Sequence, residues 1–221
     1  MIISSTEENY LKAIYKLAKI QPKGISTKSI GELLKIKSPT VSDMLKKLSD
    51  KKLIKYEKYK GVELTSKGES LALLVIRKHR LWETFLVEKL EFKWDEVHEM
   101  AEQLEHIRSK ELVNRLDKFL GNPKFDPHGD PIPNNEGKIE IRYDDTLDQI
   151  KTNAEVIVVG VKDHTKEFLN YLDKSGIQLG SKLKVVERIS YDGSIEIQNS
   201  SKKKLHLSAQ VIKNIVVKNA N

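Results

Sequence analysis

The chain has 221 residues, of which 32% are charged and 38% hydrophobic, a balance typical of a soluble globular protein. It contains no cysteine, which excludes disulfide bonds, thiolate metal sites and cysteine nucleophiles. No apolar run approaches the length of a membrane span, and no signal peptide opens the sequence. We therefore expect a cytoplasmic protein with no membrane partner.

Positive charge is concentrated in the first third of the chain. The net charge is +7, and residues 1–73 carry 15 lysines against 8 acidic residues, so this segment alone holds the whole excess. A basic segment joined to a nearly neutral remainder predicts a polyanionic partner for that segment.

Three helices and a hairpin are expected in the basic segment. Ser5 and Glu8 have the spacing of a capping box at the start of the first helix, and Ser38-Pro39 is expected to begin the third. The turn between the second and third helices is short, which indicates a helix–turn–helix. Residues 54–65 then alternate at period two around a turn, so a wing follows the recognition helix.

Hydroxyl groups near the start of the third helix can approach bases, and lysines farther along can reach phosphates. A lysine-rich face alone is more often simply solvated. Together with the helix–turn–helix and the wing, it favours DNA binding. The candidates for DNA contact are Thr27, Ser38, Pro39, Thr40, Ser42, Asp43, Lys46, Lys47, Lys58, Tyr59 and Lys60.

Imidazoles and carboxylates gather on the next two expected helices, at 66–90 and about 95–108. His79 and Glu83 are four residues apart, and a second set shares one helical face. That set is His98, Glu102, Glu105 and His106. Such spacing is also common on solvated faces, but this face has few bases, so its carboxylates would repel one another. A divalent cation would relieve that repulsion.

A third apolar stripe, at 112–120, leaves more apolar surface than one small layer can bury, so we expect self-association. Residues 121–137 are rich in Pro, Gly, Asn and Asp and form a linker. Short alternating strands are expected at 156–161, 182–188, 194–198, 203–207 and 214–218, with a helix at 165–174. This pattern predicts a small barrel.

The sequence resembles the diphtheria toxin repressor family of metal-dependent transcriptional repressors along essentially its whole length. The most specific segments are 77–83, 97–106 and the linker 127–133. The family implies a mainly α protein with a small β domain. It implies a winged helix–turn–helix at 1–73, a helical metal-binding and dimerisation domain at 74–143, and an SH3-like barrel at 144–221. It also implies a homodimer on an inverted-repeat operator in double-stranded DNA, repressing metal-uptake genes.

The resemblance implies two metal sites per chain. The ancillary site matches His79, Glu83 and His98, completed from the C-terminal domain by His164 and Glu167, with Asp163 nearby. The regulatory site matches Glu102, Glu105 and His106, completed by Asn9, where the family usually carries methionine or aspartate. In the family a carboxylate at the position of Glu102 goes with manganese sensors and a thiol with iron sensors. We therefore expect Mn(II), with Fe(II) as the alternative.

Two other classes of function remain open. A di-metal enzyme would need paired Glu-x-x-His elements, whereas only Asp95 and His98 have a comparable spacing. A winged-helix regulator of an organic ligand would not need clustered histidines and glutamates. A metal titration followed by DNA mobility shift separates these functions from a metal-dependent repressor.

Overall fold

The computed structural model describes residues 3–21, 24–57, 61–140 and 144–220. The chain forms two compact units that alternate along the sequence. Unit 1 comprises Met1–Trp82, Ala101–Asn122 and Ile132–Glu140, and unit 2 comprises Glu83–Met100, Pro123–Pro131 and Ile141–Asn221.

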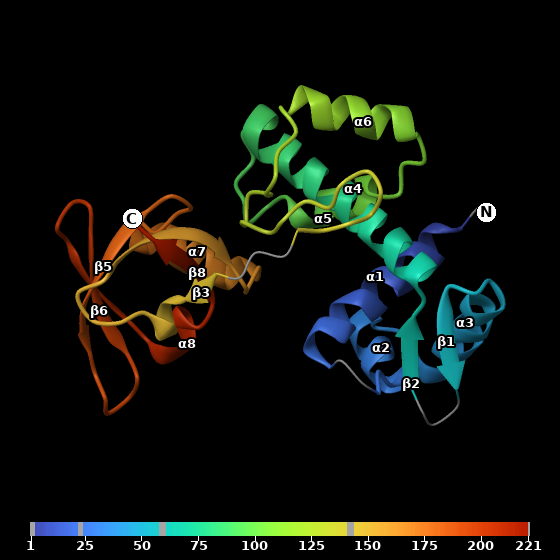
Figure 1. Cartoon of the computed structure of the whole chain (residues 1–221), viewed down its shortest axis with the longest axis horizontal. Coiled ribbons are helices and arrows are strands. Elements are labelled where there is room, and N and C mark those ends of the chain that lie inside the picture. The colour runs from blue at the N-terminus through green and yellow to red at the C-terminus, as the bar shows by residue number, and fades with distance from the viewer. Residues whose placement is uncertain (1–2, 22–23, 58–60, 141–143, 221) are drawn as a thin grey trace. The chain divides into compact units, whose positions relative to one another are not determined.

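Unit 1 begins with the expected winged helix–turn–helix, drawn in blue to cyan in Figure 1. Its elements are α1 (Ser5–Ile20), α2 (Thr27–Leu34), α3 (Ser38–Asp50), β1 (Ile54–Glu57) and β2 (Gly61–Leu64). The two strands pair antiparallel with Ile54 opposite Leu64. Leu11 of α1, Ile30 of α2 and Leu45 of α3 are fully buried in a common core. The predicted tip of the wing, residues 58–60, lies outside the described residues.

The starts of α1 and α3 differ from the predicted ones by a single residue. The capping box of α1 is formed by Ser4 and Glu7, whose backbone and side-chain groups bond reciprocally at 2.8 and 3.2 Å. Helix α3 has Lys37 as its N-cap, so Ser38 is already helical. At the start of α4 the hydroxyl of Thr65 accepts from the amide of Gly68. The shift in α1 leaves the Glu8 side chain available for other contacts.

The three central helices are α4 (Ser66–Leu90), α5 (His98–Leu104) and α6 (Lys110–Phe119). Helix α5 is shorter than the predicted 95–108, and Ser109 caps the next helix, α6, by accepting from the amide of Leu112. Along α6 Val113 and Leu116 are buried, whereas Phe119 is 65% exposed. Among the described residues, no helix is both long enough and apolar enough to cross a membrane.

Unit 2 is built on one antiparallel sheet in the strand order β3-β8-β4-β5-β6-β7, orange to red for most of its length in Figure 1. The strands are β3 (Asp145–Thr146), β4 (Glu155–Val161), β5 (Lys182–Arg188), β6 (Ile195–Asn199), β7 (Lys204–Leu207) and β8 (Ile215–Asn219). The helices are the 3-10 helix η1 (Leu147–Gln149), α7 (Lys166–Ser175) and α8 (Ala209–Ile212). The predicted strands and α7 are confirmed to within two residues, whereas β3, η1 and α8 were not predicted.

A tight turn in the linker packs against β4. The Asp126 carboxylate accepts from the amides of His128 and Asp130, at 2.8 and 3.0 Å. Gly129 has φ +86°, and a Cβ on it would lie 2.1 Å from the carbonyl oxygen of Val159, so only glycine fits here. The carbonyl of His128 accepts from the amide of Val161 at 2.9 Å. This turn fixes the backbone that carries the side chains of Asp126 and His128.

Candidate metal centres and nucleic-acid interface

Glu105 is the centre of a buried cluster in unit 1. Its side chain is fully buried, and its two oxygens contact different bases. The Nδ1 of His79 lies 2.6 Å from Oε2, and the Nζ of Lys12 lies 2.5 Å from Oε1. Burial tends to raise the pKa of Glu105, but the hydrogen bond from His79 and the charge of Lys12 outweigh it. The pKa therefore lies below its ordinary value, and the group is a carboxylate at neutral pH.

His106 is held beside Glu105 with one ring nitrogen directed toward it. Its Nδ1 lies 2.5 Å from Oε2 of Glu8, and its Nε2 lies 3.8 Å from Oε1 of Glu105. An ionised carboxylate only accepts, so Nδ1–H is the donor to Glu8 and the lone pair of a neutral ring is on Nε2. Orientation of this kind is typical of metal-binding histidines.

Of the four residues predicted for the regulatory site, three come together on α5 and the turn after it. Glu102 joins Glu105 and His106 through Lys12, whose Nζ is 3.4 Å from Oε1 of Glu102. Within the described part of the chain, no hydrogen bond links the Asn9 side chain to this cluster.

Helix α1 contributes Glu8 and Lys12 to the cluster, which were not predicted. Their spacing of four residues places them on one helical face, and this was the signal available in the sequence. A lysine has no free lone pair when charged, so Lys12 lacks the signature of a metal ligand in the sequence.

A second cluster lies in unit 2 and is formed by Glu83, Asp126 and His128. One ligand atom from each lies within 4.8 Å of the others, and all three residues are buried. The Nδ1 of His98 is 3.2 Å from Oε1 of Glu83, with the His98 side chain 40% exposed. His79 is one helical turn before Glu83 on α4.

His128 shows that this second cluster fits a cation. Its Nε2 donates to the carbonyl of Trp94 at 2.9 Å, which leaves Nδ1 facing Glu83 at 3.7 Å and Asp126 at 4.0 Å. These distances exceed a hydrogen bond, and Nδ1 is buried without a partner among the described residues. Burial lowers the pKa of His128, but the two carboxylates outweigh it and raise the pKa to about 9. Two oxygens and one nitrogen around one point suit a divalent cation.

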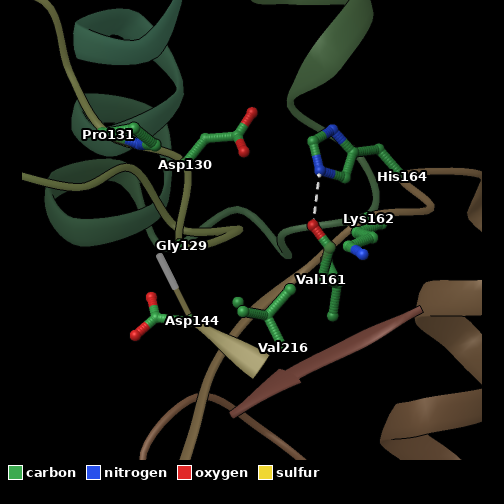
Figure 2. A pocket seen from close by; sticks show the side chains of 9 residues that line it. Gly129, Asp130, Pro131, Asp144, Val161, Lys162, His164 and Val216 are labelled. Atoms are coloured by element: carbon green, nitrogen blue, oxygen red, sulfur yellow. Dashed lines mark hydrogen bonds between the residues drawn. The ribbon is translucent and has the colours of Figure 1, made fainter. Parts of the chain in front are cut away.

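His164 lies next to this cluster. Its ring stacks on that of His128, with centroids 4.8 Å apart, and its Nε2 donates to the carbonyl of Val161 at 3.2 Å. Burial holds the pKa of His164 below its ordinary value, so the ring is neutral and Nδ1 keeps its lone pair. Figure 2 shows His164 beside Asp130 and Lys162 at a cavity of about 350 Å³.

Glu167, the other predicted ligand of the C-terminal domain, is exposed in the first turn of α7. Within the described ranges, no hydrogen bond or ion pair joins it to Glu83, Asp126 or His128. Asp126 and His128 were not among the predicted candidates, because they lie in a loop where helical spacing carries no information. Their proximity to Glu83 arises only from the tertiary fold.

The predicted recognition helix α3 presents most of its candidate DNA-contact residues to solvent. The exposed ones are Ser38, Pro39, Thr40, Asp43, Lys46 and Lys47. Ser42 is half-buried, and its hydroxyl donates to the carbonyl of Ser38 at 3.2 Å. Thr27, the first residue of α2, is also half-buried. Of the wing candidates, Lys58, Tyr59 and Lys60 lie outside the described residues.

Three family models match successive parts of the chain. They are the N-terminal DNA-binding domain of the iron-dependent repressors at residues 2–62, their metal-binding and dimerisation domain at 65–134, and the FeoA domain at 146–219.

Individual relatives extend this similarity to nearly the whole chain. The iron-dependent repressor IdeR of Mycobacterium leprae is 38% identical over 130 residues, which are 58% of this chain and 55% of that protein. The diphtheria toxin repressor of Corynebacterium diphtheriae is 29% identical over 89% of this chain and 90% of its own. A solved manganese-dependent transcriptional repressor in complex with manganese is 34% identical, with a TM-score of 0.87 over 96% of this chain and 99% of that one.

Proposed function

The chain belongs to the diphtheria toxin repressor family of metal-dependent transcriptional repressors, and on that premise we propose that it is a repressor of metal-ion uptake genes. In this proposal it acts in the cytoplasm as a homodimer on an inverted-repeat operator and binds that operator tightly only with a divalent metal. The family consists of DNA-binding regulators, so we assign no catalytic role to the chain.

One observation carries the proposal: α1, a helix of the DNA-binding segment, contributes side chains to the cluster around Glu105. A divalent cation held by Glu102, Glu105, His106 and Asn9 would tie α1 to the residues that follow α5. The metal supplies positive charge shared among these donors. By favouring one arrangement of the DNA-binding segment, it raises the fraction of molecules competent to bind the operator.

Glu8 serves this site as a positioning residue. Its carboxylate accepts from Nδ1 of His106, which directs Nε2 toward Glu105. Asn9 is the ligand from α1, because its amide oxygen can coordinate a hard cation without adding charge.

The second cluster is the ancillary site of this proposal. His79, Glu83 and His98 match the family pattern, and Asp126 and His128 add a carboxylate and an imidazole that the spacing did not reveal. His164 and Glu167 are the ligands assigned to the C-terminal domain. His164 has the stronger support, because its neutral ring stacks on His128, whereas Glu167 is exposed.

Manganese is the proposed signal at the regulatory site. Its donors are two carboxylates, one imidazole and one amide, which suit a hard cation. Both metals occur among the relatives, since the solved neighbour is named for manganese and the mycobacterial relative for iron. Iron is therefore the alternative.

The test is selection from a random-sequence duplex pool by the full chain, with Mn²⁺ and with a chelator. We expect the Mn²⁺ pool to converge on an inverted repeat, and the recovered duplex to shift in a gel only when metal is present. The control is the same duplex with one half-site scrambled, which should bind weakly with or without metal. Equal binding of the selected duplex in chelator and in Mn²⁺ would contradict the proposal.

A further inference from the structure

We propose that the ammonium group of Lys12 is an internal competitor of the regulatory metal. It holds Glu105 and Glu102 while the site is free of metal and leaves them when a divalent cation binds, so it sets the metal affinity of the site. This inference rests on the function proposed above, because it concerns the same carboxylates.

The first support is the position of the ammonium. Nζ of Lys12 lies 2.5 Å from Oε1 of Glu105 and 3.4 Å from Oε1 of Glu102, so one cation is shared by two carboxylates that also belong to the metal-binding set. Nε2 of His106 faces the same oxygen, Oε1 of Glu105, at 3.8 Å. A metal bound by His106 and Glu105 would take the oxygen that Lys12 now occupies.

The second support is the charge of the cluster. Lys12 contacts Glu105 and Glu102, whereas the ammonium of Lys78 contacts Glu8. A divalent cation bound to Oε1 of Glu105 would lie beside the ammonium of Lys12 in a site where Glu105 has no exposed surface, and the two positive charges would repel each other. Lys78 contacts Glu8, which holds His106, whereas Lys12 contacts the ligand oxygens themselves, so Lys12 is the cation that leaves.

The third support is that Lys12 has a route to solvent. Its own side chain is 9% exposed, but its second partner, Glu102, is 49% exposed and marks the solvent side of the cluster. A lysine has four rotatable carbons and a strongly hydrated head, so it can move its charge into water while its stem stays packed. Glu105, with no exposed surface, has no such freedom and must keep a cation beside it.

The decisive variant is Lys12→Met, which keeps the length of the side chain and removes the charge. It is compared with Lys12→Arg, which keeps the charge, in a Glu83→Gln background that disables the second cluster. Lys28→Met is the matched control, because Lys28 forms an exposed ion pair with Glu32 in the same DNA-binding segment. Mn²⁺ affinity is measured by equilibrium dialysis, and the melting temperature is measured in chelator.

We expect Lys12→Met to bind Mn²⁺ about tenfold tighter or more, because the metal no longer displaces a buried ammonium, and to melt at a lower temperature in chelator. Lys12→Arg should bind Mn²⁺ no more tightly than the unsubstituted background, and Lys28→Met should match it in both measurements. Equal or weaker Mn²⁺ binding by Lys12→Met would overturn the inference and leave the proposed function standing.

A second measurement needs no substitution and so does not depend on the folding of a variant. Acylation of lysines in the full native chain is followed by peptide mass spectrometry, with and without Mn²⁺. We expect Lys12 to react several-fold faster with Mn²⁺ and Lys28 to be unchanged. An unchanged or slower rate at Lys12, when dialysis shows Mn²⁺ bound, would overturn the competitor role. Failure of the native chain to bind Mn²⁺ at all would overturn the proposed function as well.

Discussion

At the scale of single residues, we expect substitution of Glu105 to have a large effect, because Glu105 is a fully buried charge between two bases. Glu105→Ala removes the buried carboxylate that holds both the ammonium of Lys12 and the ring of His79. We expect the metal-free variant to lose about 3 kcal/mol of unfolding free energy in urea, and metal-activated operator binding to disappear. The dimer should survive in light scattering. A monomeric variant would show that Glu105 is required for assembly rather than for sensing.

His106 and its orienting carboxylate give a second prediction. Glu8→Gln keeps the shape of the side chain but weakens the acceptor for Nδ1 of His106, so we expect Mn²⁺ affinity to fall about tenfold. Asn9→Asp adds a charge at the proposed ligand position and should tighten Mn²⁺ binding. Calorimetric titration of both variants measures these changes. An affinity unaffected by Asn9→Asp would argue against Asn9 as a ligand.

The raised pKa of His128 predicts that the stability of the folded protein falls as pH rises. Its pKa in the folded protein is about 9, against an ordinary value of 6.5, so protonation favours the folded state. The stability it contributes, about 3 kcal/mol, is fully present below pH 6.5 and is lost as pH rises through 9. Melting of the metal-free protein from pH 6 to 10 should show this loss, and His128→Gln should flatten it. Metal binding at pH 7.5 should release about one more proton from the native chain than from the variant.

At the scale of elements, the sequence was informative about which helices and strands exist and less so about where they begin. The start of α1 offers Ser4 with Glu7 and Ser5 with Glu8, and both pairs have capping-box spacing. Only packing distinguishes the two pairs. Glu7 is buried, and its Oε1 accepts from the Nζ of Lys51, just after α3, at 2.6 Å. Because Ser4 and Glu7 form the capping box, the Glu8 side chain is free of the cap and contacts His106. The position of the cap therefore decides which glutamate orients this histidine.

The proximity of candidate residues on the helices could be predicted, because the period of a helix fixes which side chains share a face. Glu102, Glu105 and His106 lie together as their spacing predicts. Asp126 and His128 could not be predicted, since their neighbourhood depends on a loop that Gly129 places against β4. Lys12 could not be predicted for a different reason: metal ligands are lone-pair donors, and an ammonium that competes with the metal offers no lone pair.

The recognition helix carries its own prediction. Lys46 is exposed and pairs only weakly with Asp43 at 3.5 Å, so it is available to a phosphate. We expect Lys46→Ala to weaken binding to operator and to random DNA alike, and to reduce the slope of log affinity against log salt by about one. Thr40→Ala should instead change which duplexes are selected. A salt slope unchanged by Lys46→Ala would contradict the phosphate contact.

At the scale of the whole molecule, helix α4 carries residues of both candidate clusters: His79, which contacts Glu105, and Glu83, four residues later in the sequence. Thermodynamic linkage then requires reciprocity: whatever factor the metal gives to operator affinity, the operator gives to metal affinity. In the proposed mechanism, the free metal concentration at which the protein responds therefore depends on the metal, on Lys12 and on DNA together, and not on the ligand residues alone.

We predict that Mn²⁺ is the metal that activates operator binding. Co²⁺, Ni²⁺ and Zn²⁺ bind most nitrogen and oxygen sites more tightly than Mn²⁺, so affinity alone cannot identify it. The appropriate measurement is operator binding against free metal, under anaerobic conditions, across the concentrations that cells maintain. We expect Mn²⁺ to activate the native chain at lower free concentration than Fe²⁺, because Glu102 offers a hard oxygen where a thiol would favour iron. Glu102→Cys should reverse that order, with Glu99→Cys as a control for a thiol on an exposed position of the same helix. Activation of the native chain at a lower free concentration of Fe²⁺ than of Mn²⁺ would identify iron as the signalling metal.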